Sequence, residues 1–247
     1  RHCITKMSRL HFTATDEYRN RVIQLGEHPE NVFNVGALNV DALKKIKILS
    51  KVKLEQEINF SFKGKTALVT FHPVTLQKET SGKYFQQLLD AIDSMKDLKI
   101  IFTKTLADTE GRVINKMIDD YVSSNEDKSV AFTSMGQLNY ISALNYIDVV
   151  VGNSSSGVIE TPSFKVPTIN IGDREKGRIM ADNVISVDQN INAIKDGFKK
   201  ALSFSFLKSL ANMHNPYEKP DTAKNIASIL VNYKIPNSTE KEFYDLN

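Results

Sequence analysis

The feature that most constrains the fold is a regular alternation of apolar, strand-forming runs with helical segments, which begins at Thr66. The runs TALVTFH (66–72) and KIIFTK (99–104) flank a segment, 84–95, with apolar residues at helical spacing. Strands that alternate with helices pair in parallel, since each crossover returns the chain to the same edge of the sheet. The sequence therefore predicts a doubly wound α/β fold with a parallel sheet. The alternation continues through predicted strands at 129–134, 148–152, 166–172 and 183–187 and predicted helices at 108–123, 137–145, 190–202 and 222–231.

The segments before this alternation indicate a second domain. Residues 1–9 have apolar side chains at helical spacing, and an alternating strand pattern follows at once at 10–15. We interpret residues 1–60 as the end of an amino-terminal α/β domain with a connector, and residues 61–232 as a carboxyl-terminal nucleotide-binding domain. The tail, 233–247, is expected either to pack back on the first domain or to be loose.

The stretch GNSSSGVIETPSF (152–164) follows a buried strand and leads into a predicted helix. The hydroxyls of Ser154, Ser155 and Ser156 are predicted to cap the helix start, and Gly157 to let a ligand approach the backbone. Free amide groups and the positive end of a helix dipole favour an anion such as a diphosphate. The stretch predicts a nucleotide site, although serine-rich turns before helices also occur for capping alone.

Glu160 lies about one helical turn beyond these serines. A diphosphate would repel its carboxylate, so we expect it to accept hydrogen bonds from two hydroxyls of a ribose instead.

Polar side chains follow four of the predicted strands. The residues at these strand ends are His72; Ser134, Met135 and Gly136; Asn153 with the three serines; and Arg174. Ligands of parallel α/β sheets bind at the carboxyl ends of the strands, near the point where the strand order reverses. We therefore expect one shared site at this edge.

Each strand-end residue has a role in such a site and an ordinary alternative. Arg174 could hold two phosphate oxygens or be a surface arginine. His72 could donate a proton or a hydrogen bond to a leaving phosphate, or be a structural histidine. The main chain at 134–136 could read a base edge, or Gly136 could begin the next helix.

Composition narrows the classes of function. The 247 residues are 41% hydrophobic and 25% charged, with a net charge of +3, and basic residues are interleaved with acids. No nucleic-acid-binding face is predicted. A single cysteine, Cys3, excludes an internal disulfide, and no Cys/His set has the spacing of a metal site. No apolar run approaches the roughly 20 residues that cross a bilayer. We expect a cytoplasmic protein without a metal or a membrane partner.

Six ordered motifs together resemble the hydrolysing UDP-N-acetylglucosamine 2-epimerases of sialic-acid biosynthesis. The motifs are RHCITKMSRLHFTATDEYRNRVIQLGE, VFNVGALNVDAL, VTFHPVTL, SMGQLNYISAL, GNSSSGVIETPSF and PTINIGDREKGR. The resemblance implies a two-domain fold of the glycosyltransferase-B type, with this chain as its carboxyl-terminal half and the active site between the domains. It implies elimination of UDP from a UDP-sugar and hydration of the glycal to N-acetylmannosamine, without a nicotinamide or metal cofactor.

The resemblance also implies roles for single residues. The implied roles are catalysis for His72 and Arg1, diphosphate binding for Ser154 and Ser155, ribose binding for Glu160, anion binding for Arg174 and uracil binding for 134–136.

Three further expectations follow from the resemblance. The carboxylates that transfer protons in the family lie upstream of Arg1, so this chain alone is expected to bind UDP weakly without turnover. The full-length protein is expected to be a homo-oligomer, a dimer or a tetramer. Alternative functions are a 2-epimerase for a UDP-diacetamido-trideoxyhexose in legionaminic-acid synthesis, a non-catalytic nucleotide-sugar-binding module, and a retaining glycosyltransferase of the same fold.

Overall fold

The computed structural model describes residues 1–73, 80–106, 109–235, 237, 238 and 240–246. The predicted helix start at Asp108, the last three residues of the VTFHPVTL motif and Pro236 lie outside the described residues. The chain forms two compact units: unit 1 comprises Arg1–Ile46 and Pro216–Asn247, and unit 2 comprises Lys47–Asn215. These boundaries differ from those expected at residues 60 and 232, because residues 47–60 belong to unit 2 and the helix predicted at 222–231 belongs to unit 1.

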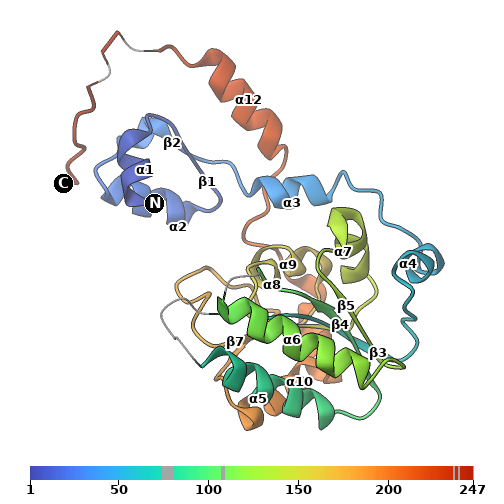
Figure 1. The fold of residues 1–247 in the computed structure, drawn as a ribbon. Helices are drawn as coiled ribbons and strands as arrows, with labels where there is room; N and C mark the ends of the chain where they lie inside the picture. Colours follow the sequence, from blue (N-terminus) through green and yellow to red (C-terminus); the bar gives the residue numbers. More distant parts are fainter. Residues whose placement is uncertain (74–79, 107–108, 236, 239, 247) are drawn as a thin grey trace. The chain divides into compact units, whose positions relative to one another are not determined.

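Unit 2 is an α/β fold built on one six-stranded parallel sheet, as predicted, and Figure 1 shows its elements along the chain. Its strands are β3 (Lys65–Thr70), β4 (Leu98–Thr103), β5 (Ser129–Phe132), β6 (Val149–Gly152), β7 (Thr168–Ile171) and β8 (Val184–Val187). Its helices are α4 (Lys51–Ile58), α5 (Ser81–Asp93), α6 (Thr109–Ser123), α7 (Gly136–Leu144), α8 (Ser156–Ile159), α9 (Thr161–Phe164), α10 (Ile191–Ala201), α11 (Phe204–Ser209) and the 3-10 helix η2 (Leu210–Asn212).

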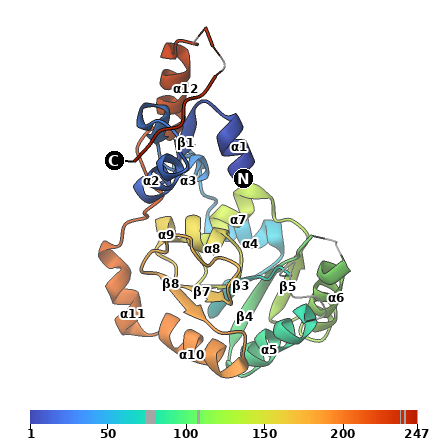
Figure 2. The ribbon, with the colours of Figure 1, turned by 90° about the vertical axis from the view of Figure 1, so that its left-hand side faces the viewer.

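The sheet of unit 2 is covered on both faces (Figure 2). Helices α5, α6 and α10 cover one face, and α7, α8 and α9 lie on the other, with α4 packed against α7. The apolar stripes of α5, α6 and α10 bury Phe85, Ile114 and Phe198 completely against β3, β4, β6 and β7. Because the strands are buried on both faces, they are continuous apolar runs rather than alternating patterns.

The strand order in this sheet is β5-β4-β3-β6-β7-β8. From β3 the chain proceeds to β4 on one side, and from β6 it proceeds to β7 on the other. The order therefore reverses between β3 and β6, which makes a crevice at the carboxyl ends of these two strands.

Gly152 allows β6 to end close against β3. It pairs in register with Thr70, has a φ of 135°, and a Cβ at this position would lie 1.9 Å from the carbonyl oxygen of Thr70. No side chain fits there, so the sequence requires glycine at the position that opens the crevice.

We predict that Gly152→Ala lowers the free energy of unfolding by about 3 kcal/mol or more, since the backbone strain and the clash with Thr70 add. Gly177→Ala is the matched control: Gly177 has a φ of 83°, but no atom lies within 4 Å of its ideal Cβ. The free energy of unfolding of this control variant should fall by only about 1–2 kcal/mol. Urea unfolding measures both variants. Equal decreases in their free energies of unfolding would contradict the proposal that contact with Thr70 requires glycine at position 152.

Unit 1 holds a two-stranded parallel sheet and four α-helices among its described residues. Its elements are α1 (His2–Met7), β1 (His11–Thr13), α2 (Asp16–Gln24), the 3-10 helix η1 (Pro29–Asn31), β2 (Val32–Asn34), α3 (Leu38–Leu43) and α12 (Thr222–Asn232). The tail returns to the start of this unit. The backbone N–H of Tyr244 donates to the carbonyl of Gly26, and Phe243 lies over the same glycine.

A buried carboxylate, Glu27, ties the tail to the rest of unit 1. Its side chain is 2% exposed and is contacted by Lys241 at 2.5 Å, Lys6 at 2.8 Å and His11 at 2.8 Å. Burial alone would raise the pKa of Glu27, but the hydrogen bonds from Lys241, Lys6 and His11 outweigh it and lower the pKa to about 2.

We predict that Glu27→Gln destabilises unit 1 at neutral pH and that the difference from the natural chain shrinks in acid. A carboxylate whose folded-state pKa lies below its unfolded value of 4.5 stabilises the fold above that value, and the stabilisation is lost as the pH falls towards 2. Unfolding curves at pH 7, 5 and 3 measure this dependence. Glu30→Gln, at an exposed carboxylate, is the control and should show no such trend.

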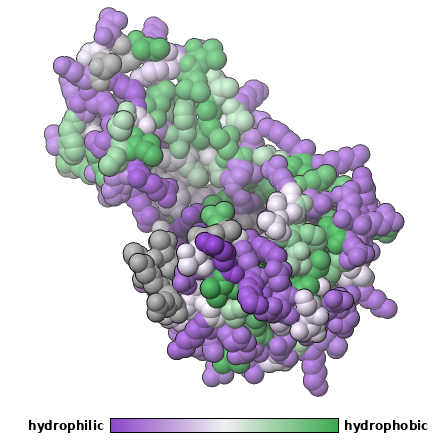
Figure 3. All heavy atoms as spheres, in the orientation of Figure 1, coloured by the Kyte–Doolittle hydropathy of each residue, from purple (hydrophilic) through white to green (hydrophobic). Residues whose placement is uncertain are grey.

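None of the helices in the described parts of the chain is both long enough and apolar enough to cross a membrane. Hydrophilic residues cover most of the face in Figure 3, and large hydrophobic side chains such as Phe204 and Val231 are exposed.

Candidate functional site

The crevice at the reversal of strand order lies between the residues that follow β3 and β6. His72 comes two residues after β3, and Asn153 comes directly after β6. Four strand ends carry the predicted site residues, and β3, β6 and β7 are adjacent in the sheet while β5 lies two strands beyond β3.

Asn153 joins the two sides of this crevice. Its Oδ1 accepts from the backbone N–H of His72 at 2.7 Å, and its Nδ2 donates to the carbonyl of His72 at 2.8 Å. Its own N–H donates to the carbonyl of Thr70 at 3.1 Å, and the residue is 0% exposed. The buried side-chain amide of Asn153 is thus bound to the His72 backbone, and contact of Asn153 with a ligand stays a prediction.

Arg174, in the loop after β7, joins the same cluster. Its Nη1 donates to the carbonyl of Asn153 at 2.8 Å and to Oε1 of Glu175 at 2.8 Å. The side chain is 35% exposed, and within the described residues only Nη1 forms hydrogen bonds. Its predicted role in anion binding stays a prediction.

Glu175 contacts the candidate site residue Arg174, and sequence reasoning did not identify it. It is 1% exposed and lies between Arg174 and Arg178, and its Oε2 forms an ion pair with Nε of Arg178 at 2.6 Å. Burial raises the pKa of the Glu175 carboxyl, and the charges of Arg178 and Arg174 oppose the rise. The sequence pattern around Arg178 is typical of a solvated surface loop, but this carboxylate holds the Arg178 side chain.

The serine loop after β6 folds differently from the prediction. α8 has only four residues, and Ser155 precedes it without a side-chain capping bond; the hydroxyl of Ser154 accepts from the N–H of Ser156 at 3.4 Å. Gly157 is buried, and a Cβ there would lie 2.7 Å from Cγ2 of Thr168. The glycine is required for packing against β7, and its predicted role in admitting a ligand stays a prediction.

Tyr140 connects this loop to α7. Its hydroxyl donates to Oγ of Ser156 at 2.7 Å. Burial raises the pKa of Tyr140 to about 12, and the negative charge of Glu160 adds to the rise, whereas the bond to Ser156 opposes it. Glu160 is therefore near enough to Tyr140 to act on it electrostatically, and the Oε2 atom of Glu160 is buried.

Ser134 and Met135 lie between β5 and α7, and Gly136 is the first residue of α7. Gly136 has a φ of 70° and begins α7, its N–H donates to Oγ of Ser134 at 3.2 Å, and Met135 is buried. Their contact with a base stays a prediction. Arg1 belongs to unit 1, and its role likewise stays a prediction.

The structure thus links His72, Asn153 and Arg174 by direct hydrogen bonds and places the serines next in the chain. Sequence reasoning missed Thr105, whose Oγ1 lies 2.8 Å from Nδ1 of His72, as well as Tyr140 and Glu175. A signal for Thr105 existed, because it follows a predicted strand at the same edge. Among the described residues, no group of three His, Cys, Asp or Glu side chains could hold a metal ion.

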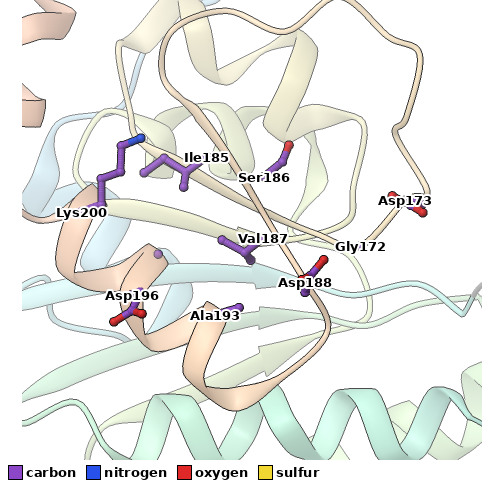
Figure 4. Close-up of a pocket in the computed structure, with 10 residues that line it drawn as sticks. Gly172, Asp173, Ile185, Ser186, Val187, Asp188, Ala193, Asp196 and Lys200 are labelled. Carbon is purple, nitrogen blue, oxygen red and sulfur yellow. The ribbon is translucent and has the colours of Figure 1, made fainter.

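A separate pocket with a volume of about 420 Å³ lies at the ends of β7 and β8. Asp196 and Lys200 from α10 form one side of it, and Ser186, Val187 and Asp188 form another (Figure 4). None of the predicted site residues lines this pocket.

Comparison with known proteins shows the family of this chain. The profile of the family described as UDP-N-acetylglucosamine 2-epimerase matches residues 1–231. The chain belongs to this family. It is 38% identical over its whole length to a GDP/UDP-N,N'-diacetylbacillosamine 2-epimerase (hydrolyzing) of Campylobacter jejuni and to polysialic acid biosynthesis protein P7 of Escherichia coli. The chain spans 64% and 63% of the lengths of these two relatives.

A solved structure of the family shares the fold. The UDP-GlcNAc 2-epimerase from Neisseria meningitidis, bound to UDP-GlcNAc, superposes with a TM-score of 0.77 at 18% identity, over 93% of this chain and 63% of that one. The fold is therefore that of the UDP-N-acetylglucosamine 2-epimerases, the glycosyltransferase-B type that the sequence predicts.

We predict that Asn153→Asp lowers the free energy of unfolding of this epimerase-family chain by about 2–4 kcal/mol. A carboxylate would keep the bond from the N–H of His72 but would face the carbonyl of His72 with a buried charge and no donor. Asn145→Asp, at an exposed asparagine, should change stability by less than about 1 kcal/mol. Chemical denaturation measures the free energy of unfolding of both variants. If Asn153→Asp were as stable as the natural chain, the role of the Asn153 amide in holding the His72 backbone would be contradicted.

Proposed function

We propose that unit 2 binds the UDP part of a UDP-sugar in a hydrolysing 2-epimerase. The observation that carries the proposal is the direct linkage of His72, Asn153 and Arg174 at the reversal of strand order in a chain of this family. In such a crevice the Arg174 guanidinium and the hydroxyls and amides of Ser154 and Ser155 bind the diphosphate.

We assign the rest of the nucleotide to the neighbouring strand ends. Glu160 binds the ribose, and the backbone around Met135 binds the uracil. Because Oε2 of Glu160 is buried, the carboxylate has to turn if both of its oxygens are to accept ribose hydroxyls. Tyr140, hydrogen-bonded to Ser156 and near Glu160, holds the diphosphate and ribose ends of the site together.

The reaction that fits this site is elimination followed by hydration. A base removes the proton at C2 of the sugar, the C1–C2 double bond forms, and the C1–O bond breaks with its electron pair on the diphosphate oxygen. Water then adds across the double bond, with hydroxyl at C1 and hydrogen at C2. The residues of unit 2 act on the leaving-group side, where His72 and Arg174 stabilise the charge that develops on the diphosphate.

Two UDP-sugars are candidate substrates, and the relatives support both. The Campylobacter jejuni relative is named for diacetylbacillosamine, a diacetamido-trideoxyhexose, and the Escherichia coli relative is named for polysialic acid biosynthesis. Both reactions share the leaving group, so the nucleotide site is common to them. We rank UDP-N-acetylglucosamine and the diacetamido sugar as equal candidates.

Product analysis distinguishes the candidates. The full-length protein is incubated in D₂O with each UDP-sugar, and NMR follows UDP release and the 2-epimeric sugar. Elimination and hydration place deuterium at C2 of the product. Release of UDP with retention at C2 would indicate simple hydrolysis, and binding of UDP without any product would favour the nucleotide-sugar-binding module.

We predict that Arg174→Ala weakens UDP binding by about 10- to 100-fold, the loss of one or two charge-assisted hydrogen bonds, while binding of uridine changes little. Glu160→Gln should weaken uridine and UDP binding by similar factors, because its target is the ribose. Calorimetric titration of the 247-residue chain measures these affinities. Arg112→Ala, at an exposed arginine of α6, is the control; if it weakens UDP binding as much as Arg174→Ala, the assignment fails.

A further inference from the structure

The ring of His72 is held by a residue from the neighbouring strand. Nδ1 of His72 lies 2.8 Å from Oγ1 of Thr105. Thr70 of β3 pairs in register with Thr103 of β4, and His72 and Thr105 each lie two residues beyond this pair. The contact therefore follows from the parallel register of β3 and β4 and not from an accident of loop conformation.

The surroundings of Thr105 decide which atom donates in this contact. Thr105 is 7% exposed, and within the described chain its hydroxyl forms no hydrogen bond other than that to His72. A buried hydroxyl that accepted from Nδ1 would leave its own proton without an acceptor, which is costly. The hydroxyl therefore donates to Nδ1, and in the neutral ring the proton lies on Nε2.

Thr105 is in turn fixed by Asn115 of α6. Oδ1 of Asn115 accepts from the N–H of Thr105 at 3.0 Å, and Nδ2 donates to the carbonyl of Thr105 at 3.0 Å. This is the same arrangement by which Asn153 holds the backbone of His72. Both the histidine and the residue that orients its ring are thus held by an asparagine amide from another part of the chain.

We propose that Thr105 and Asn115 are positioning residues that fix the His72 ring with Nδ1 as an acceptor and Nε2–H as the donor to the leaving diphosphate. The inference rests on the proposed function for the identity of that ligand. It narrows the role of His72, because a neutral ring whose Nδ1 is committed to Thr105 acts as a hydrogen-bond donor and keeps its proton.

The chemistry of the leaving group agrees with this role. The C1–O bond breaks with its electron pair on the diphosphate oxygen, and the proton remains on Nε2 of His72. A terminal phosphate with a second pKa of about 6 leaves as an anion at neutral pH, so it needs hydrogen bonds rather than a full proton. Orientation of the donor then matters more than its acidity.

Nitrogen NMR of the histidine side chains tests the proposal on the 247-residue chain. Among the five histidines, His72 is assigned by loss of its signals in His72→Gln. In the natural chain we expect a single neutral tautomer with a protonated Nε2. In Thr105→Val the two nitrogen shifts should move towards those of a mixture, and Thr105→Ser, which keeps the hydroxyl, should restore them. Asn115→Asp should move them in part.

Thr103→Val is the matched control, because the Thr103 hydroxyl bonds to that of Thr70 at the same edge without touching His72. It should lower stability but leave the His72 nitrogens unchanged. In parallel titrations, Thr105→Val should bind UDP about three- to tenfold more weakly, and Thr105→Ser should bind normally.

Each outcome separates the two proposals. A natural chain with a protonated Nδ1, or nitrogen shifts unchanged in Thr105→Val, would overturn the positioning role. If the natural chain shows the expected tautomer but does not bind UDP, the proposed function fails and the orientation of the ring by Thr105 remains.

Discussion

Two parallel strands from which the chain continues in opposite directions leave a crevice at their carboxyl ends, and here the Asn153 side chain joins the two strand ends. β3 and β6 stop pairing at Thr70 and Gly152, and just beyond them the N–H of Asn153 donates to the carbonyl of Thr70. The Asn153 amide supplies both partners for His72, and its carbonyl accepts from Arg174. Burial restrains this set of hydrogen bonds around Asn153, since each donor or acceptor of a buried amide that lost its partner would cost about 1–3 kcal/mol.

The restraint of the residues around Asn153 lowers the entropic cost of binding a ligand. A ligand that meets donors already held in place does not have to order them, so less of the interaction energy is lost to side-chain entropy. His72, Thr105 and Arg174 are each restrained by hydrogen bonds to another element of unit 2. Substitutions that keep a donor but release its restraint should therefore affect the site almost as strongly as removal of the donor.

The sequence could predict the parallel sheet and the edge at which the site lies, because these depend on the alternation of elements and on which residues end each strand. It could not assign Asn153 and Gly157, since both face neighbouring strands, and the strand pairing is long-range information. Glu175 lies in a charged run typical of a solvated loop, and only the folded backbone buries it. The units differ from the expected boundaries for a related reason: Pro216 and the residues after it pack on segments about 200 residues earlier, which local patterns do not reveal.

The buried Glu175 also sets the charge that the site presents. Arg174 and Arg178 contribute two positive charges and Glu175 one negative charge, so the three together present about one net positive charge. A diphosphate bound there would be held mainly by oriented neutral donors, the serine hydroxyls, backbone amides and the His72 ring, with one guanidinium that cannot turn away. Such donors act at short range and only in the right geometry, whereas unpaired charges attract any anion from a distance. The Glu175 carboxylate therefore weakens the general attraction of anions to this site and holds the two arginines in a fixed geometry. A fixed geometry is what recognition of one arrangement of phosphate oxygens requires.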